Sequence, residues 1–434
     1  MKKINLVYIA FILLISLNLF SCNTVNNNFK SFTDDDEITT ITKDSEKEFL
    51  EALEILNKKG GTIYIDTPVI NMIKKQSIEL LGEISGGIIG VRQKNGEYPR
   101  ISFSHKCEKE ELFCGLHVYA SNKFIEYIIV ENSKHYGIDV YGDNNILDHV
   151  ISRYNYGSGI AIFGNFNKIN YCYSYRNVEP TSSFIYSDGF LSAGELNNVF
   201  NYCFAWDNGN SGFHYIRLTN TSDLSYLHSA AWNNGNINVF TGKYDYDNGK
   251  PLDKNLWKIQ KIIESDENFA SNYYNKKFSI ENAKIDQDPV KNWVSAMTIR
   301  ADGDGFTFGF KNSTQNIDVK RNSFFNVAFG HKSGGFIDNF NHRYNAFVTD
   351  CVSFNNGINY KFPYYTLSKW SNNWSWNTKN KDQLNKGVSL KKPKNINTAQ
   401  RSFYTVRDEI IRAVTENMFP DGVNFDKAIN SLKE

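Results

Sequence analysis

Proline is scarce in this chain, with 8 residues among 434, and neither sign of charge is in excess. Lys plus Arg number 48 and Asp plus Glu number 47, which gives a formal net charge of +1. Such a balance provides no bulk attraction to nucleic acid, so we exclude nucleic acid as a partner. Aromatic residues are plentiful instead (15%), and so are asparagines. Asparagine tolerates left-handed turn conformations, so this composition suits a fold of short strands and turns.

Cysteine is also sparse, and the 6 residues present do not form a metal motif. No spacing of histidine and cysteine resembles a zinc site. Cys172, Cys203 and Cys351 occupy the same place in three similar segments (NYCYSYRN, NYCFAWDN, TDCVSFNN). We expect these three to form an inward column of small core side chains. Cys107 and Cys114 flank a short acidic loop and are able to pair if the protein is exported.

The longest apolar run lies at the N-terminus. Lys2 and Lys3 precede an apolar stretch over residues 4–17, and the segment LFSC ends at Cys22. This pattern predicts a lipoprotein signal peptide over 1–21, a lipidated Cys22 and a polar tether over 22–44. An ordinary secretory signal or a single membrane anchor stays open as the alternative. We therefore expect an exported protein, held on the bacterial cell envelope through its N-terminal lipid only and exposed at the surface or in the periplasm.

A glycine followed by an apolar residue returns at a nearly fixed interval along most of the chain. Successive gaps are 22, 30, 23, 23, 70, 30 and 22 residues between the anchors Gly137, Gly159, Gly189, Gly212, Gly235, Gly305, Gly335 and Gly357. A unit of about 22 residues indicates stacked coils that bury their apolar faces against their neighbours. The sequence therefore predicts an all-β chain whose body, residues 45–401, is one parallel β-helix.

Both ends of the predicted solenoid carry helical patterns. Over residues 45–58, Ser45 and Glu48 fit a capping box. One face of this helix is apolar, with Phe49, Ala52, Leu53 and Leu56. We expect the helix to cover the first coil, whose strand begins at Thr62, and residues 402–434 to form a partly helical C-terminal cap. The 70-residue gap predicts an insertion at 243–298 that emerges as a loop beside the binding face.

The repeat also predicts which side chains face outward. The residue after each anchor glycine should point inward and the next one outward, because side chains alternate on a strand. When the coils stack, these outward residues form an exposed column, which we expect to carry the function: Asp139, Ala161, Leu191, His214, Asn238, Thr307 and Ile337. His214 and Thr307 would lie two coils apart, at about 10 Å.

Four segments carry a resemblance to a known family: SDGF at 187–190, NVF through AW to GF over 198–213, DGF at 304–306 and SGGFID at 333–338. Over most of residues 115–400 the chain resembles the pectate lyases of polysaccharide lyase family nine. These enzymes are right-handed parallel β-helices that cleave pectate by β-elimination. The resemblance implies a right-handed solenoid and a role in pectin degradation.

In that family, calcium is held by one aspartate of a D-G-F motif and three of a D-D-G-W-D motif, and a lysine of a G-F-K motif removes the C5 proton. The resemblance implies that Asp188 is the first metal ligand here. The other three ligand positions read Asn210, Ser211 and His214, and the lysine position reads Thr307. Whether calcium is a cofactor of this protein therefore stays open. Asp188 is either a retained ligand or a turn residue whose carboxylate binds backbone amides.

One account of function keeps the lyase chemistry without this calcium site, on an acidic polysaccharide. His214 is then the natural base, because its unperturbed pKa lies nearest neutrality. Arg217 or Arg300 would neutralise the substrate carboxylate in place of calcium. Thr307 completes the predicted catalytic set, and Asn210, Ser211, Asn238 and Lys311 are the predicted substrate contacts. Lys243, Lys311 and Lys332 are further base candidates on this face, whereas Tyr215 should point inward.

Three other accounts stay open. The protein binds a glycan without cleaving it, with the aromatic residues Tyr273, Tyr274, Trp293 and Phe310 stacking on sugar rings. Alternatively it hydrolyses a glycoside, which needs two opposed carboxylates. The candidates for such a pair are Asp302, Asp304 and Asp338. A structural or adhesive surface role is the third account. In each case we expect a monomer.

Overall fold

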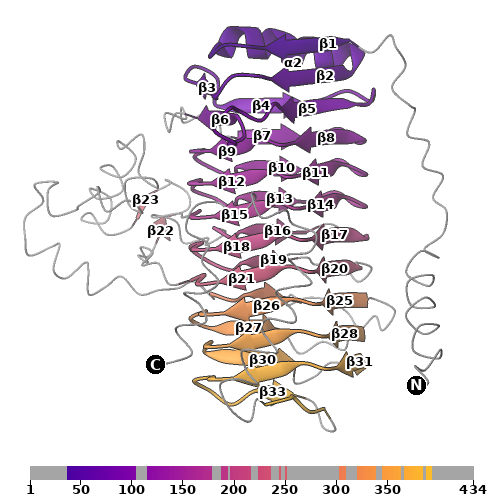
Figure 1. The fold of residues 1–434 in the computed structure, drawn as a ribbon, viewed down its shortest axis with the longest axis vertical. Coiled ribbons are helices and arrows are strands. Elements are labelled where there is room, and N and C mark those ends of the chain that lie inside the picture. The colour runs from indigo at the N-terminus through magenta and orange to yellow at the C-terminus, as the bar shows by residue number, and fades with distance from the viewer. Residues whose placement is uncertain are drawn as a thin grey trace, which may run out of the picture. The chain divides into compact units, whose positions relative to one another are not determined.

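The body of the chain is a stack of parallel coils, each built from three short strands (Figure 1). The computed structural model describes residues 37–103, 115–177, 187–193, 196–216, 223–235, 244–245, 250–251, 303–308, 320–338, 345–362, 366–384 and 388–392. Every neighbouring pair of strands in the three large sheets is parallel, which confirms the predicted parallel β-helix. Among the described residues, no helix is long and apolar enough to cross a membrane.

The first sheet has eleven strands. They are β1 (Ile38–Ile41), β2 (Gly61–Ile65), β5 (Gly86–Gly90), β8 (Lys123–Glu126), β11 (Ile146–Asp148), β14 (Lys168–Asn170), β17 (Asn198–Asn201), β20 (Leu224–Leu227), β25 (Lys320–Phe324), β28 (Asn345–Thr349) and β31 (Thr366–Ser371). The strand β1 lies within the predicted tether, so part of that segment is ordered and pairs with β2.

The second sheet has ten strands. They are β3 (Val69–Met72), β6 (Arg100–Phe103), β9 (Ile129–Glu131), β12 (Ile151–Arg153), β15 (Tyr173–Tyr175), β18 (Phe204–Trp206), β21 (Ala230–Trp232), β26 (Val327–Phe329), β29 (Val352–Phe354) and β32 (Trp374–Trp376). A separate antiparallel pair is formed by β22 (Tyr244–Asp245) and β23 (Lys250–Pro251).

The third sheet also has ten strands and carries the predicted column. They are β4 (Ser77–Leu80), β7 (Gly115–Val118), β10 (Ile138–Val140), β13 (Ile160–Ile162), β16 (Phe190–Ser192), β19 (Phe213–Tyr215), β24 (Phe306–Thr307), β27 (Gly334–Ile337), β30 (Ile358–Phe362) and β33 (Gln383–Leu384).

The predicted N-terminal helix is confirmed as α2 (Glu46–Lys59). Ser45 is its N-cap and accepts a hydrogen bond from the backbone N–H of Glu48 at 3.3 Å. The four predicted apolar residues of this helix are buried. Gly60 ends the helix at a φ of 78°, a left-handed conformation that glycine adopts without steric cost. The strand β2 follows the helix directly, whereas β1 precedes the helix and pairs with β2, so the helix lies against the N-terminal strands of the stack.

Apolar residues after the anchor glycines fill the interior. Phe190, Phe213, Phe306, Phe336 and Tyr360 form a ladder of rings with centroids 4.6–5.1 Å apart. Such stacks add about 0.5–1.5 kcal/mol per pair to the burial of the rings. The three predicted inward cysteines, Cys172, Cys203 and Cys351, are buried and unpaired, as expected. Cys107, Cys114 and Cys22 lie outside the described residues.

Two of the eight glycine anchors are wrong. Phe213 pairs directly with Phe306, so the coil after Gly212 continues at Gly305 and Gly235 is not an anchor between them. Gly235 has a φ of 70° and lies against Gly303, where an added Cβ would come within 2.1 Å of the Cα of Gly303. Phe336 pairs with Tyr360, so Gly357 is a turn residue two positions before the strand row. Equal spacing does not distinguish a turn glycine from one that opens a strand.

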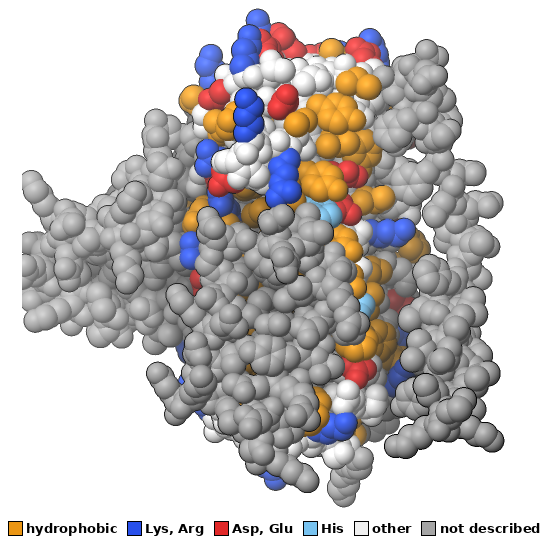
Figure 2. Space-filling model, in the orientation of Figure 1, with side chains coloured by type: hydrophobic (Ala, Val, Ile, Leu, Met, Phe, Trp, Pro, Cys, Tyr) orange, Lys and Arg blue, Asp and Glu red, His pale blue; other side chains and the backbone are white. Residues whose placement is uncertain are grey.

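The corner between the first and second sheets departs from the expected asparagine turns. Its residues have φ of 48–55°, yet they are aromatic: Tyr127, His149, Tyr171, Tyr202, His228 and Phe325. Their rings stack with centroids 4.6–5.4 Å apart. Figure 2 shows histidine side chains set among hydrophobic ones on the visible described surface. Ring stacking between coils offsets the cost of a left-handed bulky residue.

Candidate functional site

The outward column of the third sheet is in register as predicted, with two changes. Asp139, Ala161, Leu191 and His214 occupy successive coils. His214 and Thr307 belong to adjacent coils rather than to coils two apart, because β19 pairs directly with β24. The prediction that the column is exposed is also wrong. The side chain of His214 is 13% exposed, whereas the other described members are buried.

An aspartate and a histidine from adjacent coils form the centre of the candidate site. Asp188 directly precedes Gly189 and β16, and His214 is the outward residue of β19. Nδ1 of His214 lies 3.0 Å from Oδ2 of Asp188. A carboxylate only accepts hydrogen bonds, so Nδ1 carries the hydrogen and Nε2 is the nitrogen with a lone pair. This is the arrangement that orients an imidazole as a general base.

The carboxylate of Asp188 is fully buried and held by further donors. Oδ1 accepts a hydrogen bond from Nδ2 of Asn210 at 2.7 Å and from the backbone N–H of Ser211 at 2.9 Å. Oγ of Ser158, one coil earlier, lies 3.5 Å from Oδ2. The bond from the Ser211 N–H is of the kind expected for the second predicted role of Asp188, a carboxylate that binds local backbone amides. The bonds fix the carboxylate for its contact with His214.

These contacts do not suit a calcium ligand. Calcium takes six to eight oxygen ligands, whereas both oxygens of Asp188 face donors: the Asn210 amide and Ser211 N–H at one, His214 at the other. Asn210 and Ser211, the predicted substrate contacts, lie against Asp188 itself. In the described part of the chain, no group of three or more His, Cys, Asp or Glu side chains is placed to hold a metal ion. We therefore derive no chemical step through calcium.

Thr307 is buried, and its hydroxyl links two coils. Oγ1 accepts a hydrogen bond from the backbone N–H of Tyr215 at 2.9 Å. Tyr215 points inward as predicted, and its ring faces the guanidinium of Arg321 at 4.3 Å. The geometry thus gives Thr307 a structural contact beside His214. Its predicted catalytic role stays a prediction.

The carboxylates predicted for hydrolysis do not form a facing pair in the described structure. Asp338 shares a row with Phe308, one residue beyond the Thr307–Ile337 pair, and is buried at an inward position of the strand row. Asp304 is buried at the position that Asp188 holds two coils earlier. One of the two therefore faces the core, and Asp302 lies outside the described residues. The opposed carboxylates of a glycosidase are not observed.

Several predicted residues lie outside the described residues. They are Arg217, Arg300, Asn238, Lys311, Lys243, Tyr273, Tyr274, Trp293 and Phe310. Lys332, the remaining base candidate, is exposed and lies against Gly303, next to Asp304 in sequence. Partial desolvation of its ammonium group lowers the pKa of Lys332.

A second aspartate–histidine pair lies on the same sheet and was not predicted from the sequence. His117 lies one coil before Asp139 in the outward column, and its Nδ1 is 2.5 Å from Oδ1 of Asp139. Burial raises the pKa of the Asp139 carboxyl, although the hydrogen bond with His117 acts in the opposite direction. The two residues are 22 positions apart, which equals the repeat. Reading the column one coil further toward the N-terminus would have found the pair.

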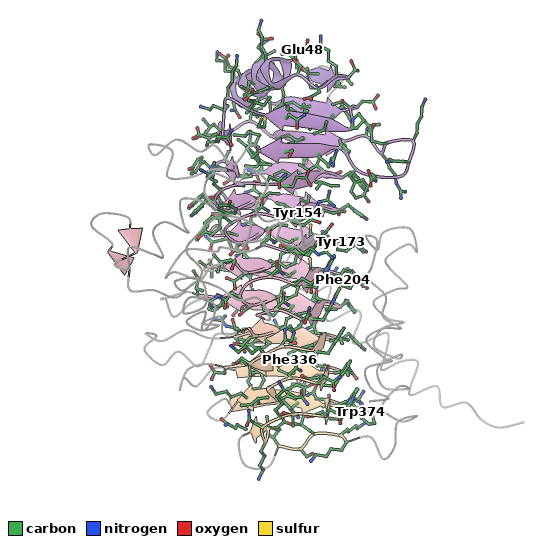
Figure 3. All side chains as sticks on the ribbon, turned by 90° about the vertical axis from the view of Figure 1, so that its left-hand side faces the viewer. Glu48, Tyr154, Tyr173, Phe204, Phe336 and Trp374 are labelled. Carbon is green, nitrogen blue, oxygen red and sulfur yellow. The ribbon has the colours of Figure 1, made fainter. Side chains whose placement is uncertain are left out.

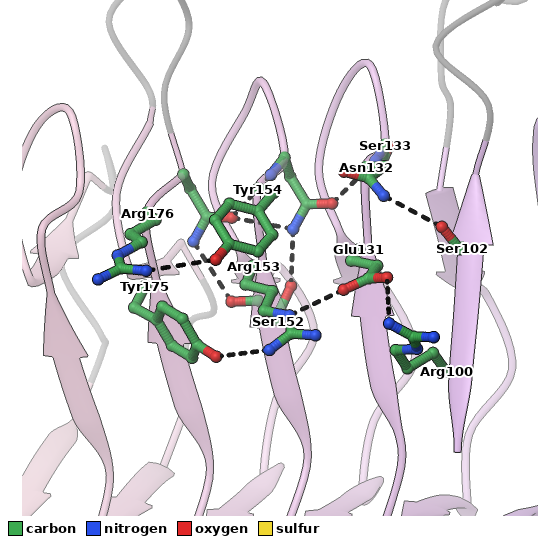
Figure 4. A network of polar contacts seen from close by, with 12 residues as sticks. Arg100, Ser102, Glu131, Asn132, Ser133, Ser152, Arg153, Tyr154, Tyr175 and Arg176 are labelled. Carbon is green, nitrogen blue, oxygen red and sulfur yellow. Dashed lines mark hydrogen bonds and ion pairs between the residues drawn. The ribbon is translucent and has the colours of Figure 1, made fainter. Parts of the chain in front are cut away.

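The outer face of the second sheet carries charges that neutralise one another. Nε of Arg153 donates to Oε2 of Glu131 at 2.8 Å, and its Nη1 donates to the hydroxyl of Tyr175 at 2.9 Å (Figure 4). Arg100 forms an ion pair with Glu131 at 3.8 Å. Beside these charged residues, the same face carries a ladder of buried and partly buried aromatic rings. Tyr173, Phe204 and Trp374 lie along this side (Figure 3). Because the charges are paired, this face is not a candidate site.

Comparisons with known proteins agree with the β-helix fold. The family model described as Pel9A-like, right handed beta helix region, matches residues 29–250, just over half of the chain. A search of the solved structures finds the crystal structure of pectate lyase Pel9A, with a TM-score of 0.51 and 17% identity. That match covers 80% of this chain and 74% of the other. The search of curated proteins gives no match. At this identity the solved structure shows the shared fold alone.

Proposed function

The chain belongs to the Pel9A-like right-handed β-helix family, and on that premise we propose that it is a polysaccharide lyase that cleaves an acidic polysaccharide by β-elimination. The observation that carries the proposal is the Asp188–His214 pair on the third sheet. It supplies an oriented general base at a family ligand position. The proposed substrate is an acidic polysaccharide that contains uronate residues.

The reaction requires removal of the C5 proton, cleavage of the C4–O4 bond and protonation of O4. Nε2 of His214 takes the proton from C5 of the uronate, and the C–H electron pair stays on C5, shared with the adjacent carboxylate. This pair forms the C4–C5 double bond as the C4–O4 bond breaks, and the electron pair of that bond leaves on O4, which takes a proton from water. General base catalysis of this kind contributes about 10²–10⁴-fold to the rate.

The carboxylate next to C5 must be neutralised for that proton to leave. We propose Arg217 or Arg300 for this role, because a guanidinium binds a carboxylate through two parallel hydrogen bonds. Arg217 directly follows Ile216, which comes two residues after His214. In this chain the arginine would replace calcium, since the contacts of Asp188 do not suit a metal ligand.

The test follows the ultraviolet absorbance of the unsaturated product. Purified protein is incubated with a panel of uronate polysaccharides, with calcium and with chelator. Absorbance that rises and survives chelation supports the proposal. Absorbance that needs calcium would show that metal ligands lie elsewhere in the chain. No product from any substrate would exclude the lyase.

A second candidate function is glycan binding without cleavage. The observation that favours it is the replacement of three ligand positions and the lysine position by Asn210, Ser211, His214 and Thr307. Retention of a uronate polysaccharide without any unsaturated product, in the same panel, would favour this second function over the first.

We also place the activity at the bacterial cell envelope. The support is the N-terminal sequence, with its charged start, its apolar run and Cys22. Labelling with a fatty acid analogue in a bacterial host tests this placement. The wild type should take up the label, and a Cys22→Ser variant should not. Equal labelling of both would exclude lipidation at Cys22.

A further inference from the structure

A second outward row on the third sheet is apolar, and three of its four members are exposed. It consists of Leu81, Tyr119, Tyr141 and Phe163, the residues that follow β4, β7, β10 and β13; we call it the tyrosine strip. Leu81 is 40% exposed, Tyr119 43% and Tyr141 38%. The ring centroids of Tyr119 and Tyr141 are 5.2 Å apart, and those of Tyr141 and Phe163 are 4.8 Å apart. Contiguous exposed apolar side chains of this kind mark interaction sites.

The His117–Asp139 pair lies beside this strip. His117 and Tyr119 are two residues apart on one strand, and their rings lie 5.9 Å apart. Oδ1 of Asp139 meets His117, whereas its buried Oδ2 has no hydrogen-bond partner in the described structure. A buried acceptor without a donor is unfavourable.

The charges on this face disfavour an anionic ligand. Glu79, His117 and Asp139 follow one another in the outward column. The described outward positions of β4, β7, β10, β13, β16 and β19 hold no lysine or arginine. A uronate carboxylate placed over Asp139 and Glu79 would meet like charges, and these described positions supply no lysine or arginine to offset them. An uncharged sugar meets no such penalty.

We propose that the tyrosine strip, with Asp139 beside it, is a binding subsite for an uncharged sugar residue of a polysaccharide. The hydroxyls of Tyr119 and Tyr141 hydrogen-bond to sugar hydroxyls, and Leu81 and the ring edges contact the sugar carbons. Aromatic residues with a polar tip suit a ligand that is apolar on one side and hydroxylated on the other.

The subsite lies on the same column as the proposed catalytic pair. Asp139 and His214 are three coils apart, which is roughly 14 Å along the axis. A polysaccharide that runs along the stack would therefore present a neutral residue to the strip and a uronate to His214. The substrate would be a mixed polymer rather than a pure polyuronate. Binding at the strip needs no catalysis, so the inference stands apart from the lyase activity.

Matched oligosaccharides test the subsite. We would titrate the purified protein calorimetrically with α-1,4-linked tetrasaccharides of galactose and of galacturonate, and with β-1,4-linked tetrasaccharides of glucose and of glucuronate. The members of each pair differ only in the group at C6. In at least one pair the neutral member should bind tenfold or more tightly than its uronate.

The variants locate the binding. Tyr119→Ser with Tyr141→Ser should weaken neutral binding at least tenfold. Phe166→Ser is the matched control, because Phe166 is 39% exposed and lies outside the strip; it should change affinity less than twofold. His214→Ala should leave neutral binding unchanged while removing lyase activity. If the double variant does not fold, Tyr141→Phe, which removes only the hydroxyl, should weaken binding about threefold.

Three results would overturn the subsite: no neutral tetrasaccharide binds, the uronates bind more tightly in both pairs, or the double variant binds as the wild type does. Absence of lyase activity with intact neutral binding would overturn the proposed function only.

Discussion

Nδ1 of His214 and Oδ2 of Asp188 lie 3.0 Å apart across two adjacent coils. The stack places them there, because Gly189 and Gly212 share a row and bring the residues beside them together. Asn210 and the Ser211 N–H fix the opposite oxygen of the carboxylate. The family fold thus carries an oriented imidazole where the resemblance placed a metal ligand.

Replacing the carboxylate that orients the imidazole should impair turnover. In Asp188→Asn we expect kcat to fall by about 10²-fold or more, with KM little changed, because the neutral amide no longer selects the tautomer with the lone pair on Nε2. Steady-state kinetics on the active polyuronate measure this change. Ser158→Ala removes the 3.5 Å contact with the same oxygen and the hydrogen bond that Oγ accepts from the backbone N–H of Asp188 at 3.2 Å, but leaves the carboxylate in place, and it should change kcat less than threefold. Equal effects of the two variants would argue against an orienting role.

A second carboxylate at Asn210 should destabilise the fold. Nδ2 of Asn210 is 2.7 Å from Oδ1 of Asp188, so Asn210→Asp replaces a buried donor with a like charge. The free energy of unfolding should fall by about 1–3 kcal/mol at neutral pH. The loss should shrink in acid, since one proton shared by the two carboxyls relieves the repulsion. Denaturant titrations at pH 7 and pH 4 measure this, and a constant loss at both would contradict the account.

His331 should make the fold acid-sensitive. It stands in a buried ladder between asparagines, where its Nδ1 accepts from the backbone N–H of Asn234 at 3.3 Å and its Nε2 contacts the carbonyl of Ala231 at 3.1 Å. Burial lowers the pKa of His331 to about 3, although these backbone contacts act in the opposite direction. The unfolded chain binds the proton at an ordinary pKa of about 6.5.

Because the folded pKa lies below the unfolded one, the stability from neutral His331 is complete above about pH 6.5. It is lost as the pH falls toward the folded value, by up to about 1.4 kcal/mol per pH unit. His331→Asn introduces the asparagine that the neighbouring coils carry at the equivalent position. Between pH 7 and pH 5 the free energy of unfolding of this variant should therefore fall by about 2 kcal/mol less than that of the wild type. Denaturant titrations of both proteins test this. Parallel pH profiles from pH 7 to pH 5 would refute it, whereas between pH 7 and pH 8 the profiles should run parallel.

We expect the contribution of a stacked aromatic ring to the free energy of unfolding to depend on how deeply the ring is buried, and not on stacking alone. Trp206 is 6% exposed between Tyr175 and Trp232, with centroids at 4.1 and 4.9 Å. Tyr141 is also stacked but is 38% exposed. We expect Trp206→Ala to cost about 3–5 kcal/mol and Tyr141→Ala about 1 kcal/mol or less. Denaturant titrations measure both, and similar losses would show that stacking dominates.

The sequence predicted the coils because their inward residues repeat with the strand period. Anchors from Gly137 through Gly335 fall in one row wherever a strand follows the glycine. Gly235 and Gly357 failed, because a turn glycine after a ladder asparagine has the same spacing as a glycine that opens a strand. The stacked corner with Tyr171 and Tyr202 was not foreseen, since single-residue preferences give asparagine the left-handed positions and omit contacts between coils.

The sequence predicted which residues belong to the candidate site, but not how these residues contact one another. Asp188 and His214 were singled out by resemblance, yet their mutual contact depends on which coils are adjacent, and motif positions do not state that. The same limit hid the His117–Asp139 pair. It also led to the expected distance of two coils between His214 and Thr307, because the long insertion was assigned one strand too late.

The measurement that tests the central claim most directly is the rate of unsaturated product formation by wild type and His214→Ala, both in chelator. We predict that the wild type forms product without calcium and that the variant, folded to the same melting temperature, loses about 10²-fold or more of that rate. His228→Ala, on another face of the stack, should keep the wild-type rate. Product formation by His214→Ala at the wild-type rate would contradict the account.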